Sequence, residues 1–122
     1  MRIFLDTADT AVIEKHFSSG LIDGITTNPT LIMKSGRNPE DVYQELIDLG
    51  IPDISMEVVG TREQMLWEGR RLANKFGKEA TIKVPCTPDG LYVCRQLAKS
   101  LVKVNVTLIF DEAQAILAAK AG

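Results

Sequence analysis

The sequence predicts an α/β fold made of parallel strand–helix units, about five of the eight that build a TIM barrel. Two observations lead to this prediction. A strand pattern followed by a helix pattern recurs five times along the chain, and each strand pattern carries a polar residue near its C-terminal end. The 122 residues are about half of the ~250 that a whole barrel takes. We therefore expect an incomplete barrel that forms a single domain over residues 1–122.

The expected strands are short and aliphatic on one face. They lie within residues 2–6, 24–28, 54–58, 79–88 and 103–109. Successive side chains of a strand point to opposite faces, so one aliphatic set is predicted to face covering helices. This set comprises Ile3, Leu5, Ile25, Val58, Val104, Val106 and Leu108, and in the fourth strand Ile82 and Val84 share a face in the same way.

Each strand is followed by a helix with start and stop signals. The first helix is expected between a cap at Asp9 and Gly20, and Asn38 begins the second. The later start signals are Thr61-x-x-Gln64, Thr87-Pro88-Asp89-Gly90 and Asp111-x-x-Gln114, and Gly77 closes the third helix. Between Asn28 and Asn38 we expect a turn and a polar loop.

The apolar positions of these helices define the predicted core face. They are Val12, Ile13, His16 and Phe17; Val42, Leu46 and Ile47; Met65, Gly69, Leu72, Ala73 and Phe76; Leu91, Cys94, Leu97 and Ala98; and Ile116 and Leu117. His16 is thus expected to be a partly buried helix residue without a catalytic role.

Lys83 stands inside the fourth expected strand, between two aliphatic residues. If one face of that strand is exposed, the ammonium of Lys83 simply lies in water. If both faces are covered, as in parallel sheets, the group must be paired, or it must lose its proton and become a nucleophilic amine. The strand alone leaves both interpretations open.

The other four strands also carry polar side chains toward their C-terminal ends. These side chains are Asp6 in the first strand, Thr26 and Asn28 in the second, Ser55 and Glu57 in the third, and Asn105 and Thr107 in the last. Parallel strands bring their C-terminal ends to one edge, and catalytic groups of barrels gather at that rim. The sequence therefore predicts that these groups converge with Lys83 at a barrel mouth.

Composition narrows the function classes. The net charge is −2, with 45% hydrophobic and 25% charged residues, and no basic run is interleaved with aromatic residues, so we expect no nucleic-acid partner. Neither a run of 18 apolar residues nor a signal-peptide pattern occurs, so we expect no membrane contact and a cytoplasmic protein.

Cys86 and Cys94 are expected to be free thiols, and with one histidine the chain offers no zinc site. Gly-rich nucleotide motifs are absent, and we expect no cofactor.

Several segments resemble one enzyme family. They are Phe4-Leu5-Asp6-Thr7-Ala8, Asp23-Gly24-Ile25-Thr26-Thr27-Asn28-Pro29-Thr30-Leu31-Ile32, Glu57-Val58, Ile82-Lys83-Val84-Pro85 and Asn105-Val106-Thr107-Leu108-Ile109-Phe110. Together they are similar to transaldolase, in the short-subunit branch that includes fructose-6-phosphate aldolase. The resemblance covers the whole chain, and its most specific parts are the Thr-Thr-Asn-Pro-Thr and Lys-Val-Pro blocks.

The resemblance implies Schiff-base chemistry on sugar phosphate substrates. Lys83 would attack the carbonyl of a donor ketose, and Glu57 would act as general acid/base through a water. Asp6 would take the proton from the hydroxyl whose collapse cleaves the carbon–carbon bond. An aldose phosphate would then leave, and a three-carbon enamine would remain on Lys83.

Four further site residues follow from the same resemblance. Asn28 and Asn105 would hold donor hydroxyls, Thr107 would orient the water or the lysine, and Thr26 belongs to the substrate-binding block. Glu57 and Asn105 resemble transaldolase, whereas fructose-6-phosphate aldolase typically has glutamine and an apolar residue there, so transfer between sugars is favoured over aldol cleavage.

Structural alternatives remain open for these residues. Asp6 can cap the loop that follows it, Asn28 can be a turn residue, and Glu57 with Lys83 can be a plain ion pair. In the family a sixth strand brings a catalytic serine and, just after it, a phosphate-binding arginine. That strand belongs to the three strand–helix units that this sequence lacks relative to a whole barrel. The chain can therefore also be a non-catalytic half-barrel. Its open edges lead us to expect a homo-oligomer or pairing with a complementary fragment.

Overall fold

The computed structural model describes residues 1–122. Its central element is one curved sheet of five parallel strands in the order β1-β2-β3-β4-β5. The strands are β1 (Phe4–Asp6), β2 (Gly24–Thr26), β3 (Ile54–Glu57), β4 (Ala80–Pro85) and β5 (Lys103–Thr107). Every strand pairs with its neighbour in sequence, so each connection carries the chain back along the sheet through a helix. The predicted α/β arrangement of an incomplete TIM-barrel-like fold is confirmed.

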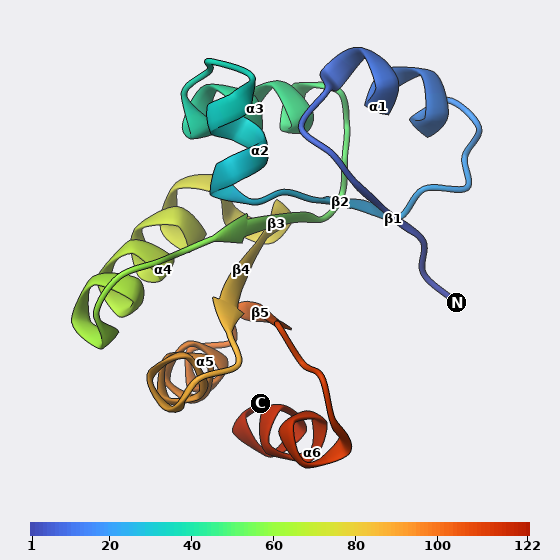
Figure 1. Ribbon diagram of the computed structural model, residues 1–122. Helices are drawn as coiled ribbons and strands as arrows, with labels where there is room; N and C mark the ends of the chain where they lie inside the picture. Colours follow the sequence, from blue (N-terminus) through green and yellow to red (C-terminus); the bar gives the residue numbers. More distant parts are fainter.

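The helices all lie on the outer side of the sheet and leave its inner side uncovered (Figure 1). They are α1 (Thr10–Phe17), α2 (Pro29–Lys34), α3 (Pro39–Asp48), α4 (Arg62–Phe76), α5 (Pro88–Lys99) and α6 (Glu112–Ala121), with a short 3-10 turn at Gly77–Glu79. None of them combines the length and apolar character needed to cross a bilayer. The uncovered side is therefore the place where the inward polar side chains of the strands remain accessible.

Side-chain caps set the start of the helices, as predicted. Asp9 accepts hydrogen bonds from two backbone N–H groups of α1, and Asn38 accepts one at the start of α3. Thr61 and Gln64 form a reciprocal capping box at α4. Thr87 and Asp111 cap α5 and α6 in turn. These caps satisfy backbone donors that have no partner inside the helix.

The hydrophobic core lies between the three central strands and the helices that cover them. Its fully buried side chains include Ile25, Val42, Leu46, Ile54, Met56, Ile82, Val84, Val93 and Leu97. At Gly69 of α4, an added Cβ would lie 3.2 Å from Ile82 and 3.1 Å from Leu97, so the missing side chain lets this helix approach β4 closely. Central packing thus follows the predicted faces of α3, α4 and α5.

Packing at the two ends of the chain differs from prediction. His16 is exposed rather than partly buried. The apolar residues predicted to face inward but found exposed are Ile3, Val12, Leu108, Ile116 and Leu117. Only the middle of the sheet has neighbours on both sides, so residues at the edges find fewer partners. In addition, β5 ends at Thr107, and Leu108 leaves the strand with a φ of 64°.

A helix stands where the sequence predicts only a turn and loop. Asn28 does end the strand, but its Oδ1 accepts a hydrogen bond from Leu31 N at 2.9 Å and caps α2, with Pro29 at the first helical position. Asn before Pro is equally a turn signal and a helix start. The helix is only six residues long, and it packs Ile32 into the core.

Candidate active site

Lys83 lies on the central part of β4 and is largely buried, with 12% of its side chain exposed. Its Nζ lies 3.3 Å from Glu57 Oε2 and donates a hydrogen bond to the backbone carbonyl of Thr27 at 3.2 Å. Strand register explains the first contact, because Glu57 of β3 is paired with Lys83 and Asn105 of β5 is paired with it on the other side. A lysine side chain lying in bulk water is therefore the wrong interpretation.

A hollow of about 590 Å³ opens beside Lys83 at the C-terminal ends of the strands. Five of the seven predicted site residues line it: Asp6, Asn28, Glu57, Lys83 and Thr107. They come from β1, the start of α2, β3, β4 and β5. The structure therefore brings these five together at one rim, as the strand pattern predicted.

Asp6 and Thr26 form one side of this arrangement. The hydroxyl of Thr26 donates a hydrogen bond to Asp6 Oδ1 at 3.0 Å, which links β1 to β2. Asp6 itself is exposed, whereas Glu57 has only 16% of its side chain exposed. The two carboxylates thus have different surroundings, and different chemical roles are open to them.

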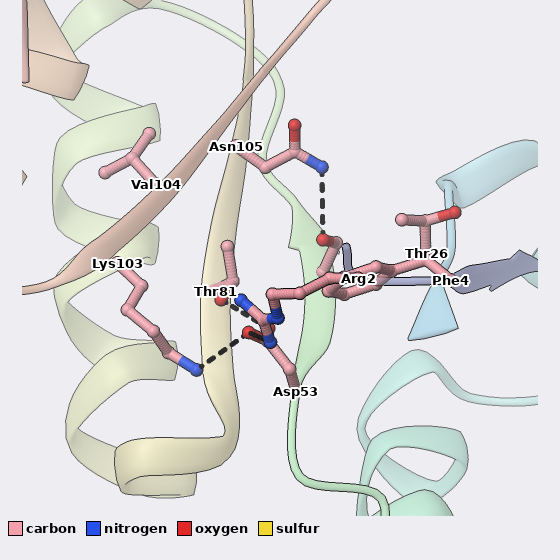
Figure 2. Close-up of a pocket in the computed structure, with 9 residues that line it drawn as sticks. Arg2, Phe4, Thr26, Asp53, Thr81, Lys103, Val104 and Asn105 are labelled. Atoms are coloured by element: carbon pink, nitrogen blue, oxygen red, sulfur yellow. Dashed lines mark hydrogen bonds and ion pairs between the residues drawn. The ribbon is translucent and has the colours of Figure 1, made fainter. Parts of the chain in front are cut away.

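Thr26 and Asn105 line a second hollow, of about 610 Å³, that follows the inner side of the sheet toward the N-terminal ends of the strands. Asn105 Nδ2 donates to Ser55 Oγ at 3.2 Å (Figure 2). The structure therefore places Thr26 and Asn105 on the same inner face as Lys83 but on the lining of the neighbouring hollow.

Asp53 forms a charge cluster at the bottom of this second hollow, which the sequence does not reveal. Its carboxylate accepts a hydrogen bond from Thr81 Oγ1 at 2.6 Å and lies 2.9 Å from Arg2 and 3.3 Å from Lys103 (Figure 2). Burial alone would raise the pKa of Asp53, but the hydrogen bonds from Thr81 and Arg2 and the charge of Lys103 outweigh it and hold the pKa below its usual range. The cluster joins the N-terminal ends of β1, β3, β4 and β5.

Thr27 is the second residue that sequence reasoning missed as part of the site. It is fully buried, and its carbonyl accepts the hydrogen bond of Lys83 Nζ at 3.2 Å, about the same distance as the 3.3 Å between Nζ and Glu57 Oε2. The available signal was its place in Thr26-Thr27-Asn28, directly after β2 and directly before the turn into α2. Alternation along the strand assigns its side chain to the core, and therefore hides the role of its backbone.

A half-barrel of βα units with a paired lysine at the C-terminal rim defines the class: an α/β protein of the TIM-barrel type with its polar cluster at the usual catalytic end. The family model described as transaldolase/fructose-6-phosphate aldolase matches residues 3–122. The chain belongs to this family.

Curated relatives agree with this assignment. The chain is 52% identical to a probable transaldolase of Anaeromyxobacter sp. (strain K), 48% to one of Nitrosopumilus maritimus (strain SCM1) and 50% to one of Caulobacter vibrioides (strain NA1000 / CB15N). Each match covers 100% of this chain and 55–56% of the relative. The chain thus spans about half the length of the curated relatives it matches.

Proposed function

We propose that this chain carries the Schiff-base lysine of a transaldolase, which transfers a three-carbon dihydroxyacetone unit from a ketose phosphate to an aldose phosphate. The observation that supports this most directly is the position of Lys83. Its amine is largely buried, contacts Glu57, and faces a hollow that is also lined by Asp6, Asn28 and Thr107. A lysine in such a setting can serve as a nucleophile once it has lost one proton.

In the first step, the lone pair of neutral Lys83 forms a bond to the ketose carbonyl carbon, and the carbonyl oxygen takes up a proton. Glu57 lies 3.3 Å from the amine and is placed to supply and remove protons as the carbinolamine loses water. The iminium that results on Lys83 is the electron acceptor for the cleavage step.

In the second step, Asp6 removes the proton of the donor hydroxyl, the carbon–carbon bond breaks, and its electron pair moves into the enamine on Lys83. Thr26 holds one oxygen of Asp6 by hydrogen bond, which leaves the other oxygen for the substrate. Asn28, Asn105 and Thr107 are proposed to bind donor hydroxyls and a water along the same inner face.

Two other functions compete with this proposal. A carbon–carbon lyase of the fructose-6-phosphate aldolase kind would use the same lysine, and the family description names both activities. The amide of Asn105 and the carboxylate of Glu57 favour transfer. A non-catalytic half-barrel that pairs with a second copy or a complementary fragment is the other candidate, because the inner face of the sheet is open.

The test is reductive trapping of the lysine. The chain is incubated with dihydroxyacetone and borohydride, and intact-mass analysis with peptide mapping locates the adduct. We expect the adduct on Lys83, and we expect Lys83→Ala to abolish it. Lys103→Ala is the matched control, because Lys103 also faces the inner side of the sheet, and this variant is expected to keep the adduct. An adduct on Lys103, or one that survives Lys83→Ala, would refute the assignment.

A further inference from the structure

The carbonyl group of Thr27 belongs to a residue that two hydrogen bonds attach to β3. The backbone N–H of Thr27 donates to the carbonyl of Ser55 at 3.3 Å, and its hydroxyl donates to the same carbonyl at 3.0 Å. Thr27 is fully buried, so water does not compete for these bonds. These two bonds hold the preceding peptide group and the side chain of Thr27 against β3, and so fix the Cα atom to which the Thr27 carbonyl is attached.

That carbonyl meets Lys83 from a different direction than Glu57 does. Lys83 Nζ lies 3.2 Å from Thr27 O on the β2 side and 3.3 Å from Glu57 Oε2 on β3. A lysine ammonium has three N–H bonds in a tetrahedral arrangement. One of them is directed at Thr27 O, the carboxylate of Glu57 attracts the ammonium toward β3, and the hollow that Lys83 lines lies on the remaining side.

We propose that Thr27 is a positioning residue for Lys83. When the ammonium loses the proton that faces the hollow, the lone pair takes that direction, because Thr27 O retains one N–H bond and the carboxylate of Glu57 attracts the other side of the amine toward β3. The amine of Lys83 is then already oriented toward the ketose carbonyl, and no further change of the lysine rotamer is needed. This inference rests on the proposed Schiff-base function and adds the residue that orients the nucleophile.

The hydroxyl of Thr27 is the part that mutagenesis can remove. Thr27→Val keeps the shape of the buried side chain but loses one of the two hydrogen bonds to β3, whereas Thr27→Ser keeps the hydroxyl. Thr81→Val is the matched control: Thr81 is also buried, its hydroxyl donates to Asp53 Oδ1 at 2.6 Å, and it lies on the strand of Lys83 toward the other end of the sheet.

The first measurement is the rate of reductive trapping with dihydroxyacetone over a range of concentrations. We expect Thr27→Val to slow trapping at saturation by about tenfold or more, with little change in the half-saturating concentration. Thr27→Ser and Thr81→Val are expected to stay within about twofold of the unchanged chain. Equal rates in Thr27→Val and Thr81→Val would overturn the proposal.

The second measurement does not depend on the ketose. Proton exchange of the Lys83 ammonium with water, followed by NMR, is expected to be slow in the unchanged chain, in Thr27→Ser and in Thr81→Val, and several-fold faster in Thr27→Val. Unchanged exchange in Thr27→Val would refute the positioning role. If no adduct forms on Lys83 even in the unchanged chain, the proposed function fails, and the exchange comparison still decides whether Thr27 orients the lysine.

Discussion

Glu57 and Asp6 are carboxylates at the same rim, yet they differ in their distance to the amine and in their exposure. Glu57 lies 3.3 Å from Lys83 Nζ, and Asp6 instead accepts a hydrogen bond from Thr26. Glu57→Gln keeps the shape of the side chain but cannot carry a proton, so we expect adduct formation on Lys83 to slow by about 10²-fold or more. Circular dichroism and urea unfolding check that the fold persists.

Asp6→Asn is expected to have the opposite profile. The amide oxygen introduced by this substitution can still accept the hydrogen bond from Thr26, so the local structure and trapping of dihydroxyacetone should be preserved. Cleavage of a ketose phosphate should fall by about 10²-fold or more, because no base remains for the donor hydroxyl. Trapping and aldose-phosphate release are measured on the same samples of each variant. Equal loss of trapping in both variants would contradict the division of labour between the two carboxylates.

At the scale of elements, the end of α5 carries a residue that its backbone does not suit. Leu101 follows the helix with a φ of 59° and is 94% exposed. The N–H of Leu101 donates to Ala98 O at 2.9 Å, and the N–H of Val102 donates to Leu97 O at 3.1 Å, which is a helix ending usually occupied by glycine. A leucine side chain there costs about 1–2 kcal/mol and makes no buried contact in return.

Leu101→Gly is therefore expected to raise the free energy of unfolding. The relieved strain exceeds the added entropy of glycine in the unfolded chain, and the net gain is about 0.5–1 kcal/mol. Ser100→Gly is the control, because Ser100 has a φ of −95° and no left-handed strain to relieve, so that variant should lose stability. Urea unfolding with an unchanged m-value measures both. A loss of stability in Leu101→Gly would show that the leucine side chain is needed there.

The sequence predicts elements whose signals are local. Asp9, Asn38 and Thr61 cap helices because each forms bonds within three residues of itself, and the alternation around Lys83 follows from strand geometry. The helix α2 is not predicted because Asn28-Pro29 has two local meanings, and packing of Ile32 in the core decides between them.

Contacts between distant segments are less accessible to sequence reasoning. Asp53 gains its partners only when the strands assemble, because Arg2 and Lys103 are far from it in the chain. Thr27 contributes a backbone carbonyl, which carries no residue-type signal. Five of the predicted site residues still lie together at one rim, since parallel strands align their ends.

On the scale of the whole molecule, Asp53 ties the sheet together and makes its stability depend on pH. The pKa of Asp53 is lowered from its usual 3.8, so the folded state is favoured by the ionised form. This contribution is fully present above pH 3.8 and is lost as the pH falls through the lower pKa of the folded state.

Asp53→Asn is expected to lower the free energy of unfolding at pH 7, because the amide loses the charge attraction to Arg2 and Lys103. The loss is limited to about 1–2 kcal/mol, since both partners are partly exposed and water screens their attraction. The difference from the unchanged chain should shrink as the pH drops below 3.8. Asp48→Asn changes the same charge at an exposed position of α3 and should show no such closing gap. Urea unfolding at a series of pH values measures this, and parallel curves for Asp53→Asn at all pH values would contradict it.

Association follows from the surfaces that the sheet leaves open. β1 and β5 are edge strands with unpaired backbone groups, and the segment after β5 exposes Phe110 at 81% and Ile116 at 67%. Unpaired edge strands and large exposed apolar side chains both favour contact with another chain, so we expect the 122-residue chain to associate in a concentration-dependent way. Sedimentation velocity at several concentrations measures the distribution of species.

Ile116→Ser should shift association to higher concentration, whereas Trp67→Ser on α4, also 67% exposed but far from both edges in the sheet order, should leave it unchanged. A single monomeric species at every concentration would refute pairing at the edges, and an effect of Trp67→Ser alone would move the contact to the outer face of α4.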